Sequence, residues 1–359
     1  MIPGYYFFRG RYALGHFLKS LNLPKDSQIA IQAFTCVAVV EGIALSGSKP
    51  IYIDILEKDV VMDPADLLKK LTARTKVVVV QHTFGRVADM NQISALCRER
   101  GLILIEDCCH TWSSKSGSKE VGSFGVASFY SFEWGKPVIA GIGGFLRLND
   151  QSLGPALVKH LHAEVIEPPL FRRVQLELQY IAFRLFFRPK FYWKLRKLYH
   201  FLSKGRLITA SYNPSGEESP ESKWSMSKWA RLRLKTFDKK LARLKTHSSA
   251  LSQVYDHILG AFDLPRKADG VFAHRFPLFV KNKEELLKLA SKKEIEIAGW
   301  YDSPIHPLKG SELNKVGYLE GSCPNAERAS STLISLPTHL TISKCEAEKI
   351  ANFVKNYGN

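Results

Sequence analysis

The sequence predicts an α/β fold, with a large three-layer domain built on a mainly parallel mixed sheet and a small C-terminal α+β domain. In the first 150 residues, short apolar runs rich in β-branched residues alternate with segments of helical periodicity. Later in the chain, one long helical pattern leads into a strand and further helices. We therefore expect the large domain over residues 1–222, and a connecting helix with the small domain over residues 223–359.

The first part of the chain contains four predicted strands. They cover residues 28–32, 50–54, 76–81 and 102–106. The last two are near-continuous apolar runs, as expected for strands buried on both faces, and residues 91–100 between them have the spacing of a helix that ends at Gly101. Ligands of such sheets bind at the carboxyl ends of the strands, where His82 and Asp107 are expected to lie.

A basic, aromatic stretch at residues 155–210 interrupts this alternation. It has no strand pattern, and prolines at 168–169 and 189 divide it into helical pieces. Residues 159–206 hold eleven Lys and Arg against three Glu, a large share of the net charge of +17. Such an excess favours anionic partners, such as a nucleotide-linked substrate or a membrane surface. We expect no nucleic-acid partner, because no recognition motif accompanies the charge.

The C-terminal part follows a linker at residues 211–221 that is rich in Pro, Ser, Gly and Glu. Apolar residues at helical spacing predict one long helix from about residue 225 to 259. A strand over residues 276–280, a helix over 283–292 and a closing helix over 345–357 complete the small domain.

Composition indicates an ordinary globular protein. Of the 359 residues, 45% are hydrophobic, and the spacings of the six cysteines fit neither a zinc site nor a disulfide scaffold, so we expect no metal. We find no charged leader followed by an apolar core, and no apolar run long enough to span a membrane. We expect a cytoplasmic protein with reduced thiols.

Lys136 and Asp107 are the residues on which the functional interpretation depends. Asp107 ends the predicted strand 102–106, and Lys136 precedes a glycine-rich turn at residues 141–144. A strand-end carboxylate with a downstream lysine is the pair that a pyridoxal phosphate (PLP) enzyme needs, since the lysine binds the cofactor covalently and the aspartate keeps its ring nitrogen protonated. Alone, the lysine would be a surface residue and the aspartate a helix N-cap.

Further residues could complete a cofactor site. His110 could hydrogen-bond the cofactor's phenolic oxygen, and Phe34 could cover its ring, although each is also compatible with a structural role. A phosphate needs hydrogen-bond donors and positive charge. The candidates are Ser131, Gly10, Arg11 and Tyr12.

At this point the chain resembles the DegT/DnrJ/StrS group of sugar aminotransferases, PLP enzymes of fold type I. The resemblance is carried by motifs that occur in the family's order along most of the chain. They are Lys49-Pro-Ile-Tyr-Ile-Asp54, Thr72-Ala-Arg-Thr-Lys76, Gln81-His-Thr-Phe-Gly85, Ile105-Glu-Asp-Cys-Cys-His110, Ser131-Phe-Glu-Trp-Gly-Lys136, Cys323-Pro-Asn-Ala-Glu-Arg328 and Leu333-Ile-Ser-Leu-Pro337.

The resemblance implies a homodimer with active sites shared across the subunit interface. It also implies amino transfer, usually from glutamate, to a keto sugar on a nucleotide, as in cell-surface polysaccharide biosynthesis. Lys136 would hold the cofactor and then move the proton at the reacting carbon. We expect the acceptor to be selected by residues such as Trp300, Tyr301 and His306.

Two positions depart from the family pattern. Arg11 stands where threonine is usual in the phosphate motif, and Lys223-Trp-Ser-Met226 replaces a segment whose asparagine reaches the neighbouring subunit's phosphate. Arg11 and Lys223 could therefore hold the phosphate by charge.

The stretch at 155–210 has no evident family counterpart. Its mixture of bulky apolar and cationic side chains suits a helix in a membrane interface, so we expect peripheral contact with the inner leaflet and a lipid-associated substrate. The alternative is a solvated helical hairpin packed on the dimer.

Two other functions compete with amino transfer. A sugar dehydratase of the same fold is disfavoured by Lys136, because such relatives typically carry histidine there. A PLP-binding protein that has lost turnover and has a membrane or regulatory role is compatible with the altered phosphate motif.

Overall fold

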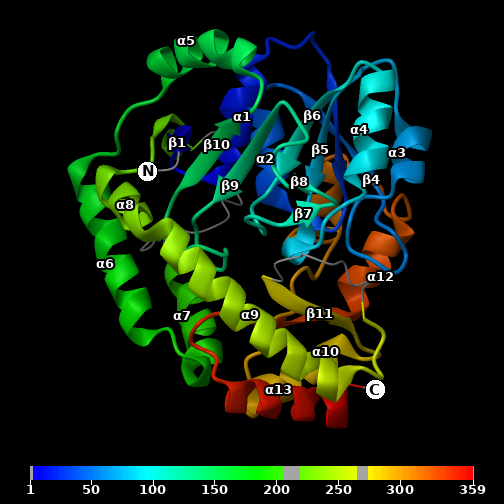
Figure 1. Ribbon diagram of the computed structural model, residues 1–359, viewed down its shortest axis with the longest axis vertical. Coiled ribbons are helices and arrows are strands. Elements are labelled where there is room, and N and C mark those ends of the chain that lie inside the picture. The colour runs from blue at the N-terminus through cyan, green and yellow to red at the C-terminus, as the bar shows by residue number, and fades with distance from the viewer. Residues whose placement is uncertain (1–2, 205–218, 265–273, 359) are drawn as a thin grey trace.

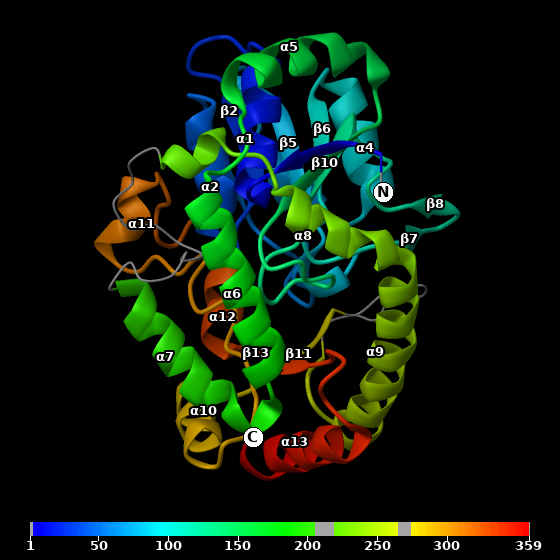
Figure 2. The same cartoon turned by 90° about the vertical axis from the view of Figure 1, so that its left-hand side faces the viewer.

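The computed structural model describes residues 3–204, 219–264 and 274–358 (Figures 1 and 2). Its main sheet has seven strands in the order β1-β10-β9-β6-β5-β2-β4. These are β1 (Tyr5–Phe7), β2 (Gln28–Gln32), β4 (Lys49–Ile53), β5 (Thr75–Gln81), β6 (Ile103–Asp107), β9 (Ala127–Ser131) and β10 (Gly144–Leu148). Strands β9, β6, β5, β2 and β4 pair in parallel, whereas β10 is antiparallel to both its neighbours. The predicted fold class is confirmed, and the four predicted strands lie within one residue of β2, β4, β5 and β6.

Helices cover both faces of this sheet, as Figure 1 shows. They include α1 (Gly10–Ser20), α2 (Val37–Leu45), α3 (Pro64–Lys70) and α4 (Met90–Glu99). Side chains alternate between the two faces of a strand, so Val77 and Val79 join the core under α1 and α2, while Val78 and Val80 join the core under α3 and α4. The continuous apolar run of β5 follows from burial on both faces.

Glycines allow α1 and α2 to pack in close contact. A Cβ on Gly15 would lie 2.6 Å from the Cδ2 atom of Leu45, and a Cβ on Gly42 would lie 2.7 Å from the carbonyl oxygen of Arg11. Larger residues would push the helices apart. The N-terminus of α1 is therefore held in a fixed position against β9 and β10.

The C-terminal part of the chain has a second hydrophobic core around a two-stranded sheet. Strand β11 (Arg275–Phe279) pairs antiparallel with β13 (Leu333–Pro337). The helices of this part are α9 (Phe237–Leu259), α10 (Lys283–Lys292), α11 (Ser311–Lys315), α12 (Pro324–Thr332) and α13 (Lys344–Tyr357). The strand and helices predicted for this region are confirmed within one residue.

The long helix predicted from residue 225 is broken. Ser227 caps a short helix, α8 (Lys228–Leu232), by accepting from Ala230 N–H, and a 3₁₀ turn over Arg233–Thr236 separates it from α9. The break itself lies at Thr236, whose backbone is not helical (φ −105°, ψ 24°), while the guanidinium of Arg233 in the same turn donates to the carbonyl of Ala140 and pairs with Glu177. Tertiary contacts therefore override the helical periodicity here.

The basic, aromatic stretch folds into helices divided at its prolines, as predicted. They are α5 (Gly154–Glu164), α6 (Leu170–Phe186), the 3₁₀ turn Pro189–Phe191 and α7 (Tyr192–Lys204). Figure 2 shows α6 and α7 together on the side of the molecule that faces the viewer. Trp193 Nε1 donates to the carbonyl of Ile295 at 2.6 Å, which fixes α7 there. In the described residues, no helix is long and apolar enough to cross a membrane. Most of the predicted linker at residues 211–221 falls outside the residues that the structure describes.

A short parallel ladder joins the two parts of the chain. Strand β12 (Ile305–His306) pairs with β3 (Thr35–Cys36), and Thr35 N–H donates to the carbonyl of Pro304. The remaining strands, β7 (Lys115–Ser116) and β8 (Lys119–Glu120), form a separate hairpin. The β12–β3 ladder carries the C-terminal loop at residues 300–306 to the carboxyl ends of the main strands.

Candidate active site

Lys136 lies on the connection between β9 and β10. This loop is closed by hydrogen bonds between Phe132 N–H and Gly143 O and between Ala140 N–H and Phe132 O. Gly135 has φ +75°, and a Cβ there would lie 2.8 Å from the ring of Trp300, so only glycine fits. Lys136 is half-buried, and its Nζ lies 3.0 Å from His110 Nε2.

His110 is buried and neutral. Burial lowers its pKa well below the usual value, and the charges of Lys136, His274 and Arg275 act in the same direction. Phe84 N–H donates to Nδ1 at 3.2 Å, so the proton of the neutral ring belongs on Nε2. That nitrogen faces Lys136 and can donate to its amine once the lysine is uncharged, because only then does Nζ carry a lone pair.

Asp107 ends β6 directly opposite Gln81 of β5. It is 4% exposed, and its Oδ1 accepts from Cys109 N–H at 2.9 Å. Burial raises its pKa, against the opposing effects of the Cys109 hydrogen bond and the Lys136 charge. Among the described residues it forms no ion pair, so it can accept a cationic N–H such as that of a protonated pyridine ring.

The adjacent Glu106 has a different environment. It is fully buried, and its oxygens accept from the backbone N–H groups of Gly122, Phe124 and Gly125. Burial would raise its pKa, but His82 and these amides lower it overall. Although Glu106, His82 and Cys108 bring potential metal-ligand atoms within 4.8 Å of one another, the carboxylate is already occupied in fixing the loop 122–125.

Aromatic rings cover the space beside His110. Phe34, with φ +62°, packs edge-on against Tyr301 at 5.3 Å between ring centroids. Phe84 stacks on His110 at 5.7 Å, and the Tyr301 hydroxyl lies 3.4 Å from His110 Nε2. The structure therefore brings Phe34 and Tyr301, predicted from distant parts of the chain, to the same site as Lys136.

The N-terminus of α1 packs against the end of β9. A Cβ on Gly10 would approach the Cβ of Ser131 at 3.3 Å and the Sγ of Cys109 at 3.5 Å, so this helix end packs directly on Ser131, one of the predicted phosphate residues. Ser131 is buried and donates to Glu133. Tyr12 is buried on the same helix, and burial raises its pKa.

The two cations expected at the phosphate differ in burial and pairing, and their role there stays a prediction. Arg11 is paired with Glu41, and Arg9 with Glu133 and Glu221, so the charge of Arg11 is already balanced. Lys223 is exposed at the end of a 3₁₀ turn, Pro220–Lys223. Within one chain the structure does not bring Lys223 to Lys136, and its expected target was the neighbouring subunit's phosphate, which stays a prediction.

The predicted substrate residues line the C-terminal side. Trp300 packs against Gly135, and the ring of His306 lies 5.5 Å from that of Tyr301. His306 is only half-buried and is hydrogen-bonded to Asp302 through Nδ1.

Sequence reasoning missed His274 and Arg275, at the start of β11. His274 Nε2 donates to the carbonyl of Gly135 at 2.6 Å, and its N–H donates to Phe84 O. Burial lowers the pKa of His274 well below its usual value. The only sequence signal was a His-Arg pair just before the predicted strand at 276–280. Local sequence does not show that this pair lies beside Gly135 in the folded chain.

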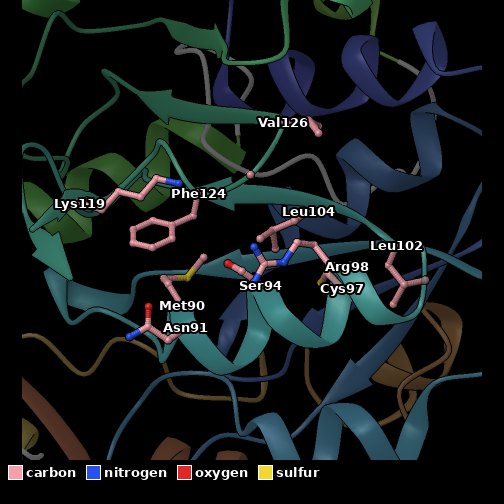
Figure 3. Close-up of a pocket in the computed structure, with 11 residues that line it drawn as sticks. Met90, Asn91, Ser94, Cys97, Arg98, Leu102, Leu104, Lys119, Phe124 and Val126 are labelled. Carbon is pink, nitrogen blue, oxygen red and sulfur yellow. The ribbon is translucent and has the colours of Figure 1, made fainter. Parts of the chain in front are cut away.

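A pocket elsewhere in the molecule contains none of the site residues predicted from the sequence. It has a volume of about 410 Å³ and lies between α4 and the loop at residues 119–126 (Figure 3). Asn91, Ser94, Arg98 and Lys119 supply its polar lining. The constellation around Lys136 is thus distinct from this pocket.

Comparison with known proteins identifies the family. Residues 9–167 and 229–355 match the DegT/DnrJ/EryC1/StrS aminotransferase family, and the gap between them coincides with α6, α7 and the linker. The chain is 25% identical over 351 residues to the pleiotropic regulatory protein of Geobacillus stearothermophilus, covering 95% of this chain and 82% of that one. It is 34% identical over 144 residues to GDP-perosamine synthase of Escherichia coli O157:H7, covering 40% of each protein.

Solved structures of similar fold agree. DesV of S. venezuelae, in complex with a ketimine intermediate, superposes with a TM-score of 0.73 at 20% identity, covering 99% of this chain and 85% of that one. NtdA from Bacillus subtilis with bound cofactor PMP superposes with a TM-score of 0.70 at 17% identity, covering 98% and 72%. The chain therefore belongs to the DegT/DnrJ/EryC1/StrS aminotransferase family and is a PLP-dependent aminotransferase of fold type I.

Proposed function

We propose that this protein transfers an amino group from glutamate to a keto sugar, carried on a nucleotide or associated with lipid, in cell-surface polysaccharide or related biosynthesis. The observation that carries the proposal is the contact of Lys136 with His110, beside a buried Asp107 that has no ion-pair partner among the described residues. GDP-perosamine synthase and a UDP-N-acetyl-3-dehydro-α-D-glucosamine aminotransferase among the relatives support a nucleotide-linked acceptor.

Each residue has a separate task in this proposal. PLP, when bound, supplies an electron sink for the carbanion that forms at the substrate carbon. Asp107 holds the ring nitrogen in its protonated form, Ser131 and the N-terminus of α1 bind the phosphate, and Lys136 moves the proton at the reacting carbon. His110 Nε2–H orients the lysine amine, and Phe34 and Tyr301 exclude water.

We further propose a homodimer with shared active sites, in the cytoplasm. Lys223 would then act across the interface, which agrees with its exposed position away from Lys136 in a single chain. Trp300, Tyr301 and His306 would contact the acceptor.

The absorbance spectrum tests the reaction. PLP bound to the wild-type protein should absorb at roughly 410–430 nm, and addition of glutamate should remove that band as the cofactor takes the amino group. Lys136→Ala should lack the band and all turnover. Lys288→Met, which removes an exposed lysine on α10, serves as the control and should keep both. A wild-type protein that stays colourless in PLP would contradict the proposal.

A second function is favoured by the outer surface of α6. Seven large apolar side chains on this helix are between 42% and 69% exposed: Leu170, Phe171, Val174, Leu178, Ile181, Leu185 and Phe186. Most recur at spacings of three or four residues, so they form one stripe. The acids of the helix and of the segment before it are used internally, since Glu177 pairs with Arg233 and Glu167 with Arg231.

We propose that this stripe lies in an anionic membrane surface. Exposed cations at the end of α6 and the start of α7, including Arg184, Arg188 and Lys190, would contact the headgroups. The inner face of α6 packs on the Lys136 loop, because Phe183 lies 4.4 Å from Trp134 between ring centroids. The exposed stripe of α6 would serve a membrane or regulatory role if turnover were lost, as the name of the Geobacillus relative suggests.

Vesicle flotation checks the membrane proposal. The wild-type protein should float with vesicles containing anionic phosphatidylserine at low salt and less so with neutral vesicles. Replacing Leu178, Ile181 and Leu185 by serine should abolish flotation. Leu319→Ser, at a residue that is equally exposed at 69% but isolated on the small domain, should not. A stripe variant that still floats, or that only changes the oligomeric state, would remove the idea.

A further inference from the structure

Arg275 is a buried cation to which the proposed amino transfer assigns no task. It begins β11 and is 7% exposed. In the part of the chain that the structure describes, its Nε and Nη1 have no hydrogen-bond partner. Burial lowers the pKa of Arg275, against the opposing effects of Tyr192, Glu296 and Tyr301. The side chain therefore stays cationic with unused donors.

Such an arrangement is costly in a folded protein. A buried donor without an acceptor costs about 1–3 kcal/mol, and more when it is charged. Glu296 acts on Arg275 electrostatically but forms no ion pair with it among the described residues. Its Oε1 is hydrogen-bonded to His339 at 2.8 Å, and its Oε2 is without a partner. Two donors of the Arg275 guanidinium are therefore left without an acceptor in the part of the chain that the structure describes.

The position of Arg275 connects it to the candidate active site. Its guanidinium carbon lies 4.4 Å from the ring centroid of Trp300, and the other edge of that ring packs on Gly135. The preceding residue, His274, is hydrogen-bonded to the Gly135 carbonyl. Arg275 is thus one aromatic ring away from the loop that carries Lys136, and its charge also acts on His110.

The guanidinium group determines which ligand fits. Its planar fork of N–H donors matches two oxygens of a carboxylate or a phosphate, which a lysine ammonium cannot do. A ring stacked on one face keeps the fork in plane and leaves its edge for the ligand.

We propose that Arg275 binds an anionic oxygen group of a substrate, the carboxylate of the amino donor, beside Trp300. This rests on the proposed amino transfer. A phosphate of the acceptor offers the same chemistry from a second source.

Binding of glutarate, a dicarboxylate without an amino group, tests the residue apart from turnover. We expect calorimetry on the PLP-loaded protein to show glutarate binding that Arg275→Gln weakens roughly 10- to 100-fold, since a charged hydrogen bond contributes about 1.5–3 kcal/mol. Arg275→Lys should fall between the two. Parallel titration with inorganic pyrophosphate separates the sources. Loss of pyrophosphate binding alone would assign the site to a phosphate, and unchanged binding of both anions in the folded variants would overturn the proposal.

Two controls keep this result separate from folding and from the donor assignment. Arg328→Gln removes an arginine that also stacks on a ring, Phe279 at 5.2 Å, but that is exposed and donates to the backbone of Glu57. It should bind glutarate like the wild type. If glutamate leaves the wild-type spectrum unchanged, the donor proposal fails, while the glutarate titration still decides the role of Arg275.

Discussion

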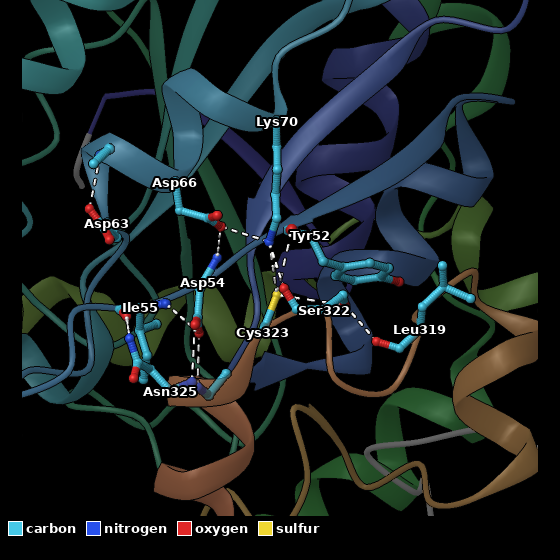
Figure 4. Close-up of polar contacts among 12 residues, drawn as sticks. Tyr52, Asp54, Ile55, Asp63, Asp66, Lys70, Leu319, Ser322, Cys323 and Asn325 are labelled. Carbon is cyan, nitrogen blue, oxygen red and sulfur yellow. Dashed lines mark hydrogen bonds and ion pairs between the residues drawn. The ribbon is translucent and has the colours of Figure 1, made fainter.

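Two aspartates lie at the carboxyl ends of two strands of the main sheet, β4 and β6, but have different surroundings. Asp54 follows β4 and is 6% exposed, and Asp107 ends β6 and is 4% exposed. Asp54 Oδ1 accepts from Ile55 and Ala326 N–H, and its Oδ2 accepts from Asn325 N–H (Figure 4). Asp107 accepts a single backbone hydrogen bond, from Cys109.

The difference separates structure from chemistry. Asn325 and Ala326 lie in the first turn of α12, whose N-cap residue Cys323 makes no side-chain capping bond, so Asp54 caps this helix from across the molecule. Two of the family motifs therefore meet in a structural junction. The carboxylate of Asp107 keeps acceptor capacity for a partner from outside the chain. Buried polar groups that are fully paired support the fold, and those left incomplete mark the site.

The largest expected effect comes from Asp107→Asn. Because losing one partner of a buried ion pair costs about 3–5 kcal/mol, we expect PLP affinity or turnover to fall roughly 150- to 5,000-fold. The apo-protein should be no less stable, since a buried carboxylate without an ion pair has been removed. Cofactor titration by absorbance and thermal unfolding of the apo-protein measure the two. A clear loss of apo-protein stability would make Asp107 structural and end the comparison.

Asp54→Asn should show the reverse pattern. The asparagine side chain has only one oxygen, so at least one N–H that the aspartate binds loses its partner. We expect a loss of about 2–3 kcal/mol in the free energy of unfolding. The absorbance of bound PLP per folded molecule should not change. Denaturant unfolding and the PLP spectrum of the same sample check this, and loss of the band in folded protein would contradict it.

Lys283 extends the comparison to the lysines. Its Nζ donates to the carbonyls of Tyr301 and Ser330, and burial lowers its pKa to about 8. The unfolded chain keeps this proton up to about pH 10.4, so between about pH 8 and 10 the unfolded state binds more protons and stability rises with pH, by at most about 1.4 kcal/mol per unit. Lys283→Met should remove that rise. Unfolding measured from pH 7 to 10 in both proteins tests it, and equal slopes would refute the assignment.

The smallest expected effect is the loss of folding stability as the pH falls. Burial lowers the pKa of both His110 and His274, whereas unfolded histidine titrates near about 6.5. Below that pH the unfolded state binds more protons, so stability falls as pH falls. His274→Gln keeps a donor for Gly135 and should reduce the slope by up to about one proton, or about 1.4 kcal/mol per pH unit. Parallel unfolding curves from pH 7 to 5 for variant and wild type would show that His274 does not titrate in this way.

Local patterns predicted the strands and most helices well, because alternation and helical spacing are properties of neighbouring residues. The break in the turn Arg233–Thr236 was not predictable in this way. The turn there is accompanied by contacts of Arg233 with Ala140 and Glu177, which are far apart in sequence. The ion pair between Arg11 and Glu41 on α2 was likewise not predicted, and a role of Arg11 at the phosphate stays a prediction.

The sequence by itself determined the α/β class and the order of the family motifs, and it singled out Asp107 and Lys136. Each follows from short-range features: a buried strand, its terminal carboxylate and a lysine before a glycine turn. Only the tertiary structure decided that His274, Arg275 and Trp300 surround the Lys136 loop and that Asp54 caps α12. The physical reason is that these contacts form when the β12–β3 ladder and the small domain close onto the main sheet, and no local periodicity encodes which distant side chains then meet.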